Sequence, residues 1–304
     1  MSAIHEIRQV SPSRLNRLTQ TVSAYIEVTK PKILIMLTFT SLCAAFVAAK
    51  GIPSVSVMFA MLLSASLSAG GSAAINMWYD RDIDVMMERT AKRPIPAGLI
   101  EPSAVLWFGI FLGILSVTVA FTFVNPLTAW LNAIGYFYYA VVYTMWLKRR
   151  TPLNIVIGGG AGAFPILIGW ASVTGSLSVT AWLMFMVVFL WTPPHSWALA
   201  LYKNDEYTKA GIPMMPVVKG PHSTKIQSLF YMILLFICSL ILSVNGDFNY
   251  FYLGGALIFN SSLFYCTWKM WKEDDQQFIW AKRTFICSLF YILGMFSAMV
   301  AGTF

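Results

Sequence analysis

Three side chains with oxygen donors are spaced four residues apart where a long apolar stretch ends: Asn76, Asp80 and Asp84. On an α-helix this spacing places them on one face, with neighbouring side chains about 5–6 Å apart. Two carboxylates about 4 Å apart repel by roughly 4 kcal/mol at an effective dielectric near 20, so they favour a bound cation. Mg²⁺ takes one or two carboxylates from a protein and fills its other positions with water or phosphate. The spacing therefore predicts a magnesium site with these three residues as ligands.

We call Asn76, Asp80 and Asp84 the oxygen stripe. Basic side chains follow it at Arg89, Lys92 and Arg93. They cannot all pair with the aspartates, and guanidinium and ammonium groups suit a polyanion such as a diphosphate. An ordinary solvated loop between two membrane helices would also carry charges. It would not need three oxygen ligands on one stripe that begins inside the apolar segment, so we favour a site for a metal-bound diphosphate.

The composition is that of an integral membrane protein. The chain has 304 residues, of which 58% are hydrophobic and 11% charged, and its mean hydropathy is +0.67. Apolar runs long enough to cross a bilayer as helices recur throughout, without the alternating pattern of a sheet. Residues 1–32 are predicted to form a polar tail before a single transmembrane domain, residues 33–304. We predict an all-α fold with nine transmembrane helices at 33–50, 55–77, 104–123, 127–147, 153–172, 179–200, 227–244, 251–270 and 284–303.

Lys and Arg lie almost entirely on one side of this topology. With a cytoplasmic N-terminus, Lys50 is the one basic residue outside the cytoplasmic tail and loops, as the positive-inside rule expects. The net charge of +8 thus reflects membrane topology, and a nucleic-acid partner is not expected. The tail lacks a cleavable signal and is a poor mitochondrial transit peptide. We predict a bacterial inner membrane protein whose active site lies near the cytoplasmic face.

A second polar loop follows the sixth predicted helix and resembles the first. It carries Tyr202, Lys203, Asp205 and Glu206, then further basic residues, and then turns through proline and glycine. The two loops lie four helices apart, which suggests an internal repeat of helices 1–4 and 5–8 with a ninth helix added. We expect the loops to face each other across one central cavity on the cytoplasmic side.

Some features inside the apolar spans suit either packing or a ligand. Small residues at 158–163 let helices approach closely in lipid, or leave room for a flat or long ligand. His195 is the one histidine within an apolar span, so it either bonds to a neighbour or contacts a substrate. The acidic run 273–275 is expected to be solvated, because consecutive positions do not share a helical face.

The oxygen stripe at a membrane-helix end resembles the first aspartate-rich motif of the UbiA superfamily of intramembrane prenyltransferases. The resemblance extends from about Tyr25 onward, and several strings are similar to the haem-farnesylating branch: 79–84, 86–90, 93–94, 194–197 and 211–220. It implies nine transmembrane helices around a cavity, Mg²⁺, farnesyl diphosphate as donor and haem b as the acceptor substrate. The superfamily often has Asp-x-x-x-Asp in its second loop. Here Asp205 and Glu206 are followed by Lys209, so the loop lacks the Asp-x-x-x-Asp pattern of a second full metal site.

The candidate residues are expected to divide the chemistry among them. Four basic residues would clamp the oxygens of the metal-bound diphosphate: Arg89, Lys92, Arg93 and Lys203. Asp205 or Glu206 would complete a second cation site or orient Lys203. Three aromatic rings are candidates for stabilising an allylic farnesyl cation: Trp78, Tyr79 and Tyr202. His195 would contact the haem as an axial ligand, and the resemblance implies a final addition of water.

Other functions stay open on the sequence alone. A related prenyltransferase acting on a quinone or other aromatic acceptor would share the first loop without needing the region around His195. A transporter would place its charges inside the spans, whereas these acids lie at their ends. A haem-handling membrane protein without chemistry would keep its haem affinity without Mg²⁺ or Asp80. The resemblance also makes haem A synthase or an oxidase assembly factor a conceivable partner.

Overall fold

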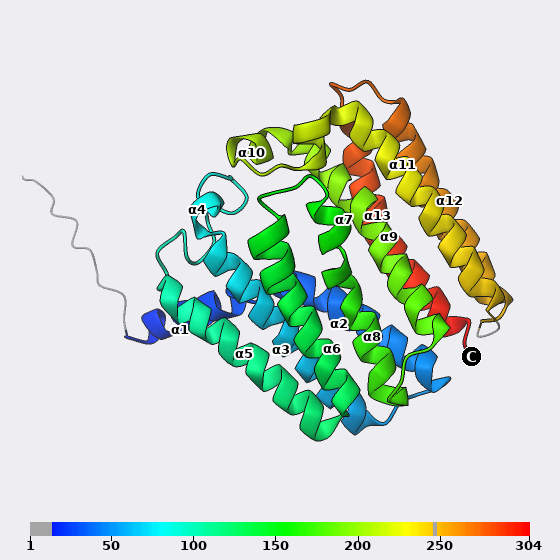
Figure 1. Ribbon diagram of the computed structural model, residues 1–304, viewed down its shortest axis with the longest axis horizontal. Helices are drawn as coiled ribbons and strands as arrows, with labels where there is room; N and C mark the ends of the chain where they lie inside the picture. Colours follow the sequence, from blue (N-terminus) through cyan, green and yellow to red (C-terminus); the bar gives the residue numbers. More distant parts are fainter. Residues whose placement is uncertain (1–13, 246–247) are drawn as a thin grey trace, which may run out of the picture.

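The computed structural model describes residues 14–245 and 248–304, so the first part of the predicted tail lies outside the described residues. All regular secondary structure in the described ranges is helical. The helices run in the following order (Figure 1): α1 (Arg14–Val28), α2 (Pro31–Ala49), α3 (Val55–Tyr79), α4 (Arg81–Asp84), α5 (Pro102–Phe123), α6 (Pro126–Phe137), the π-helix η1 (Tyr138–Leu147), α7 (Asn154–Gly158), α8 (Gly160–Thr174), α9 (Val179–Tyr202), α10 (Asn204–Lys209), α11 (Met215–Val244), α12 (Tyr250–Lys272) and α13 (Ile279–Ala301).

Several long helices begin at residues whose side chains cap the first turn. Ser54, Asn125, Ser178 and Asn249 each accept a hydrogen bond from a backbone N–H of the turn that follows. These bonds satisfy donors that would otherwise be left unpaired at the helix start. Polar residues between the apolar runs therefore fix where α3, α6, α9 and α12 begin.

Seven helices in the described part of the chain are long and apolar enough to cross a membrane: α2, α3, α5, α7–α8, α9, α11 and α13. The remaining two predicted spans are also helical. One is α6 continued directly by η1, and the other is the 23-residue helix α12. The chain is thus an all-helical, multi-pass membrane protein, and the count of nine spans stays a prediction.

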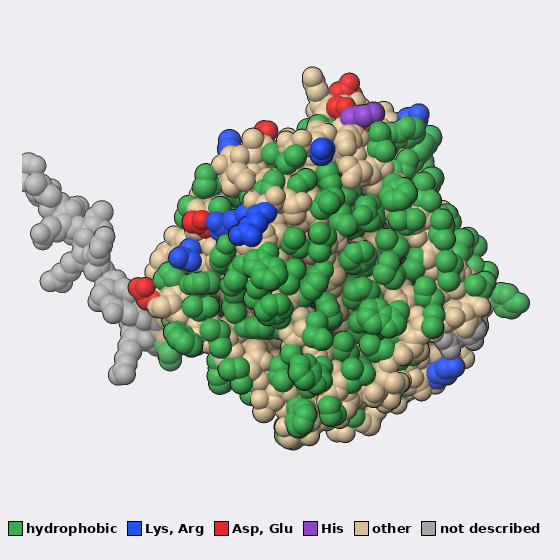
Figure 2. All heavy atoms as spheres, viewed as in Figure 1, with side chains coloured by type: hydrophobic (Ala, Val, Ile, Leu, Met, Phe, Trp, Pro, Cys, Tyr) green, Lys and Arg blue, Asp and Glu red, His purple; other side chains and the backbone are tan. Residues whose placement is uncertain are grey.

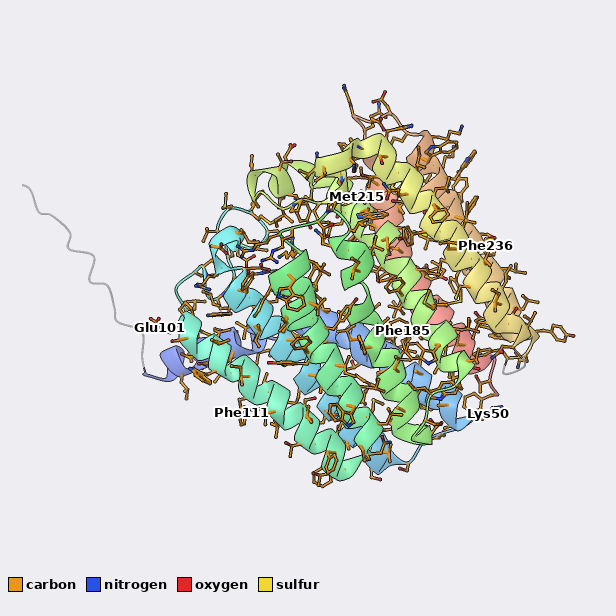
Figure 3. The ribbon with its side chains drawn as sticks, in the orientation of Figure 1. Lys50, Glu101, Phe111, Phe185, Met215 and Phe236 are labelled. Atoms are coloured by element: carbon orange, nitrogen blue, oxygen red, sulfur yellow. The ribbon has the colours of Figure 1, made fainter. Side chains whose placement is uncertain are left out.

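The helices of the two halves of the chain pack against each other. In the first half α3 packs closely on α5, and in the second half α9 packs closely on α11. The contact between α2 and α8 joins the two halves. The last helix, α13, packs on α12, α9 and α2. Figure 2 shows a largely apolar face, with most of its charged side chains along the upper and upper-left margin. Lys50 lies at the opposite end of the molecule (Figure 3).

The small residues around the start of α8 include some that allow close helix contacts and one that lines a cavity. A Cβ at Gly158 would overlap the ring of Tyr143, and a Cβ at Gly169 further along α8 would overlap the carbonyl oxygen of Ser41 on α2. Glycine therefore permits these helix contacts. A Cβ at Gly162 would meet no atom within 4 Å. Gly162 lines a cavity instead.

This cavity lies between α2, α3, the α6–η1 helix and α8, and has a volume of about 130 Å³. Lys30 and Tyr139 lie at its polar end, where they are hydrogen-bonded to each other. The rest of its wall is apolar or small, and includes Leu34, Leu37, Ser72, Gly162, Phe164 and Pro165. An apolar chain could lie against this wall.

Gly169→Ala is expected to lower the free energy of unfolding by about 3 kcal/mol, because a methyl group would force α8 away from the α2 backbone. Gly162→Ala, seven residues earlier on the same helix, is the matched control and should unfold like the wild type. Thermal unfolding in detergent measures both. Equal stability of the two variants would contradict the close α2–α8 contact.

Candidate functional site

The oxygen stripe lies at the end of α3 and in the short helix that follows. Asn76 is in the last turn of α3, Asp80 ends that helix, and Asp84 ends α4. Their exposed fractions are 3%, 0% and 2%. Asn76 and Asp80 share one helical face, whereas Asp84 follows a turn at Asp80. The hydroxyl of Thr90 donates to the Asp84 carbonyl at 2.8 Å and folds the loop back on itself.

Asn76 and Asp80 are bonded to each other and to basic residues from distant segments. Asn76 Nδ2 donates to Asp80 Oδ2 at 2.8 Å and to Thr144 Oγ1 at 3.1 Å. Lys30, directly before α2, donates to Asn76 Oδ1 at 2.5 Å. Lys148, directly after η1, pairs with Asp80 Oδ2. The starts and ends of three different helices therefore converge on the stripe.

Asp84 is held by Arg93 from its own loop. Arg93 Nη1 donates to the two carboxylate oxygens at 2.8 and 2.7 Å. Each residue of the oxygen stripe is thus bound by a basic side chain. The sequence pattern does not identify Lys30 or Lys148 as site residues, because the positive-inside rule accounts for both. The position of Lys30 just before the proline that opens α2 is the one signal that singles it out.

Lys30 stands between the oxygen ligands and the apolar cavity. Its Nζ lies 3.4 Å from the Tyr139 hydroxyl, and both residues line the cavity. Burial lowers the pKa of Lys30 to about 7, and the positive charges of Arg93 and Lys148 act in the same direction. The carboxylates of Asp80 and Asp84 oppose this lowering of the pKa, but the groups in direct contact with Lys30 are a neutral amide and a tyrosine hydroxyl.

The donors of the stripe suit a hard divalent cation. No group of three or more His, Cys, Asp or Glu in the described ranges could hold a metal, so the available set is two carboxylates and one amide oxygen. Mg²⁺ commonly uses one or two protein carboxylates and completes its shell with water and phosphate. Asn76, Asp80 and Asp84 fit that requirement.

Asp82 is exposed and is bound by Arg149, which also lies 3.4 Å from Asp80 Oδ1. The guanidinium donates to Asp82 at 2.6 and 2.7 Å and to the Tyr79 carbonyl at 3.0 Å. This pair holds the pKa of Asp82 below its usual range. Arg149 also lies 4.7 Å from the centre of the Tyr79 ring. Trp78 is likewise covered by a cation, with the Arg81 guanidinium 5.3 Å from its ring.

The two polar loops meet, as the sequence predicts, but they pack directly on each other and do not face each other across the cavity. Ile83 and Met87 of the first loop form one buried cluster with Tyr207, Ile212 and other residues of the second, and α4 and α10 are neighbours in Figure 1. Burial raises the pKa of Tyr207, and the positive charge of Arg89 across the loops opposes this rise. The loops therefore close one end of the bundle together.

The remaining predicted residues of the loops differ in exposure. Arg89, Lys92 and Asp205 are exposed, whereas Glu206 is partly buried. Lys203 Nζ donates to Glu206 Oε1 at 2.6 Å, and Glu206 Oε2 is buried without a hydrogen-bond partner. Glu206, rather than Asp205, thus has a free inward oxygen, and it can both orient Lys203 and accept a further cation or donor.

His195 lies apart from the stripe, at the contact between α9 and α13. Its ring stacks between Trp191 and Phe285, with ring centres 4.2 and 4.7 Å away. Its Nδ1 is 2.6 Å from Ser288 Oγ, and the Ser288 hydroxyl donates to the Phe285 carbonyl at 2.7 Å. Because a serine hydroxyl has one proton, Nδ1 must be the donor to Oγ. This tautomer leaves the lone pair on Nε2.

Comparison with known proteins agrees with this arrangement. The model of the UbiA prenyltransferase family matches residues 37–293, and the chain belongs to that family. It is 47% identical over 281 residues to a protoheme IX farnesyltransferase of Symbiobacterium thermophilum, covering 92% of this chain and 94% of the relative. It is 43% identical over 306 residues to that of Bartonella henselae, covering 100% and 98%.

Solved structures share the fold at low identity. A digeranylgeranylglyceryl phosphate synthase superposes with a TM-score of 0.78 and 17% identity, covering 93% of this chain and 98% of that one. A UbiA homologue from Archaeoglobus fulgidus bound to DMAPP and Mg²⁺ gives a TM-score of 0.66 and 16% identity, covering 90% and 98%. The helical arrangement is therefore that of the UbiA fold.

Arg93→Gln should destabilise the protein in chelator by about 2 kcal/mol, because the buried Asp84 carboxylate loses its cation. Lys92→Gln, one position earlier and exposed, is the control and should stay within about 0.5 kcal/mol of the wild type. Thermal unfolding without divalent metal compares them. If the Arg93 variant were as stable as the control, the ion pair would not hold the loop.

Proposed function

We propose that this protein transfers the farnesyl group of farnesyl diphosphate to a vinyl group of haem b, with addition of water, to make haem O. The observation that carries this proposal is a buried oxygen stripe ringed by cations at the mouth of an apolar cavity. Protoheme IX farnesyltransferases at 43–47% identity over nearly the full chain support the same reaction.

Asn76, Asp80 and Asp84 would hold Mg²⁺, which when bound offsets the charge of the diphosphate leaving group. The Archaeoglobus fulgidus homologue of the same fold, bound to Mg²⁺ and DMAPP, supports this use of the stripe. Glu206, with its unpartnered buried oxygen, would serve a second cation or orient Lys203. Asp205 is exposed and has the weaker case for a role.

The basic side chains act by changing partners. Without substrate, Lys148 and Arg93 neutralise Asp80 and Asp84. Asn76, Asp80 and Asp84 would hold the metal, and Lys148 and Arg93 would then be free to bind the oxygens of the diphosphate, so that each charge would stay paired. Arg89, Lys92 and Lys203, which are exposed or partly exposed at the same end, would complete the clamp. Lys30 would meet the diphosphate where the chain of the donor enters the cavity.

The farnesyl chain would lie in the apolar cavity below Lys30. When the carbon–oxygen bond breaks, the electron pair leaves with the diphosphate and an allylic cation remains. Tyr139 lines this cavity and stacks on Tyr143, with ring centres 5.5 Å apart. The Lys30 ammonium lies 5.8 Å from the centre of the Tyr139 ring. Tyr139 is nevertheless better placed to face the allylic cation than Tyr79 or Trp78, because it lines the cavity and they do not. Tyr202, beside Phe285, would lie nearer the acceptor.

His195 would bind the haem. Its Nε2 lone pair is the group that an iron centre requires, and Ser288 fixes the tautomer that supplies it. The vinyl π-electrons would form the new carbon–carbon bond, and water would add to the resulting cation with loss of a proton. A quinone acceptor would not need this histidine, which favours haem.

The wider organisation follows from the same proposal. We infer nine spans, with α6–η1 and α12 added to the seven apolar helices, in a single domain of residues 33–304. The matching contacts of α3 with α5 and α9 with α11 support the four-helix repeat. The two loops and their cations would lie on the cytoplasmic side of a bacterial inner membrane, with the N-terminus on that side. Haem A synthase or an oxidase assembly factor is the partner to which the product would pass.

Turnover of the purified protein in nanodiscs with haem b, farnesyl diphosphate and Mg²⁺ tests this function, with the porphyrin product followed by mass. Farnesylated, hydrated haem should form. Chelator should abolish it, and Asp80→Asn should lower the rate by about 10²–10³-fold. Asp82→Asn is the control and should have little effect. Prenylation of an added quinone precursor without any haem product would overturn the acceptor.

Lys148→Met should raise the affinity for Mn²⁺ about tenfold in the absence of diphosphate, because Asp80 loses a competing cation. The same variant should bind farnesyl diphosphate more weakly. Electron paramagnetic resonance of free Mn²⁺ measures the first effect. Arg150→Met, two residues later and exposed, is the control. Unchanged or weaker Mn²⁺ binding in the Lys148 variant would contradict the exchange of partners.

A further inference from the structure

A second group of cations lies at the end of α12, away from the diphosphate site. The ammonium group of Lys269 is surrounded by three aromatic rings and lies 5.8 Å from Tyr265, 5.9 Å from Trp268 and 5.8 Å from Trp280. Tyr265 and Trp280 also touch edge to face, with ring centres 5.7 Å apart. Since Trp280 belongs to α13, the rings join the two helices at this level.

Arg283 stands on one of these three rings, and Lys272 stands on the neighbouring ring of Trp271. Lys272 lies 4.1 Å from the Trp271 ring centre, and Arg283 lies 4.6 Å from the Trp280 ring centre. Cation–π contacts hold the positive groups in place without neutralising their charge. The aromatic–basic patch consists of Tyr265, Trp268, Lys269, Trp271, Lys272, Trp280 and Arg283.

The patch faces outward at the edge of the apolar surface. Tyr265 and Trp268 are 50% and 38% exposed, and Ile279 and Ile286 on α13 are 58% and 45% exposed. Exposed isoleucines on a membrane-spanning helix mark a face in contact with lipid. Trp and Tyr gather where such a face meets the headgroups, and Lys and Arg extend toward them. The patch therefore lies at headgroup level.

The acidic residues between α12 and α13 do not neutralise the patch. Glu273, expected from sequence to be solvated, instead caps α13 by accepting from the N–H groups of Ile279 and Trp280 at 3.0 and 3.1 Å. Asp274 accepts from the backbone N–H of Gln276 at 2.8 Å.

The third acid of this loop is also engaged elsewhere. Asp275 pairs with the fully buried Lys225 at 3.0 Å. Lys269, Lys272 and Arg283 consequently have no carboxylate partner within the described ranges 14–245 and 248–304. Three unpaired positive groups thus stand together at the edge of the apolar surface.

We propose that the aromatic–basic patch binds the phosphate headgroup of an anionic phospholipid. The phosphate oxygens would accept from Lys269, Lys272 and Arg283, which supply the charge that no carboxylate of the chain provides. The acyl chains would lie along the exposed isoleucines of α13. A free phosphate ion would gain nothing from that apolar face, so the lipid is the better fit.

The test compares lipid retention by native mass spectrometry of the full chain released from nanodiscs of phosphatidylglycerol and phosphatidylcholine. The test variant is Lys269→Gln/Lys272→Gln/Arg283→Gln. The control is Arg150→Gln/Lys209→Gln/Lys219→Gln, which removes the same charge from exposed residues of the same end. Wild type and control should retain phosphatidylglycerol at least tenfold better than phosphatidylcholine. Each single substitution in the patch should reduce this preference about fivefold, and the triple variant should abolish it.

Other outcomes would overturn the proposal. Equal loss of phosphatidylglycerol in the control triple variant would mean that net charge alone attracts the lipid. An unchanged preference in the patch variant would place lipid binding elsewhere. A third arm adds inorganic phosphate to the protein in phosphatidylcholine nanodiscs. Phosphate that binds as tightly as phosphatidylglycerol, and is lost with the patch, would identify a free ion rather than a lipid as the ligand.

Discussion

The structure depends on the neutralisation of two carboxylates that are buried at the end of an apolar bundle. Asp80 and Asp84 are 0% and 2% exposed, and an unpaired charge in such a place costs several kcal/mol. Arg93 offsets that cost for Asp84, and Lys148 and the more distant Arg149 offset it for Asp80. The same carboxylates would be satisfied by a metal with a diphosphate, so the ion pairs and the bound metal are alternative ways of meeting one electrostatic requirement.

This requirement also positions the apolar cavity. Lys148 follows η1 and Lys30 precedes α2, and their bonds to Asp80 and Asn76 draw these two helices onto the end of α3. The three helices then enclose the cavity together with α8, whose glycines allow its backbone to lie close to α2. Lys30 belongs to both places, so it would couple the binding of the diphosphate to the binding of the prenyl chain.

The sequence predicted the all-helical membrane architecture and the meeting of the two loops, because each leaves a local or repeated pattern. The spacing placed Asn76, Asp80 and Asp84 on one helical face, and it did not reveal the turn at Asp80 that puts Asp84 in a separate short helix. The sequence did not identify Lys30 or Lys148 as site residues, since their partners lie 46 and 68 positions away and the positive-inside rule explains basic residues there without a site. Tyr139 was missed because it lies in the π-helix η1, whose wider turn changes which side chains face inward. Glu273 was misjudged because its capping role depends on how α13 begins.

The most direct test of the exchange of partners is an experimental structure with Mg²⁺ and a non-hydrolysable thiolodiphosphate analogue of farnesyl diphosphate. The account predicts the metal on Asn76, Asp80 and Asp84. It also predicts Lys148 and Arg93 on the diphosphate oxygens and the prenyl chain in the cavity beside Tyr139. A diphosphate bound elsewhere, or Lys148 still paired with Asp80 in the loaded protein, would contradict it.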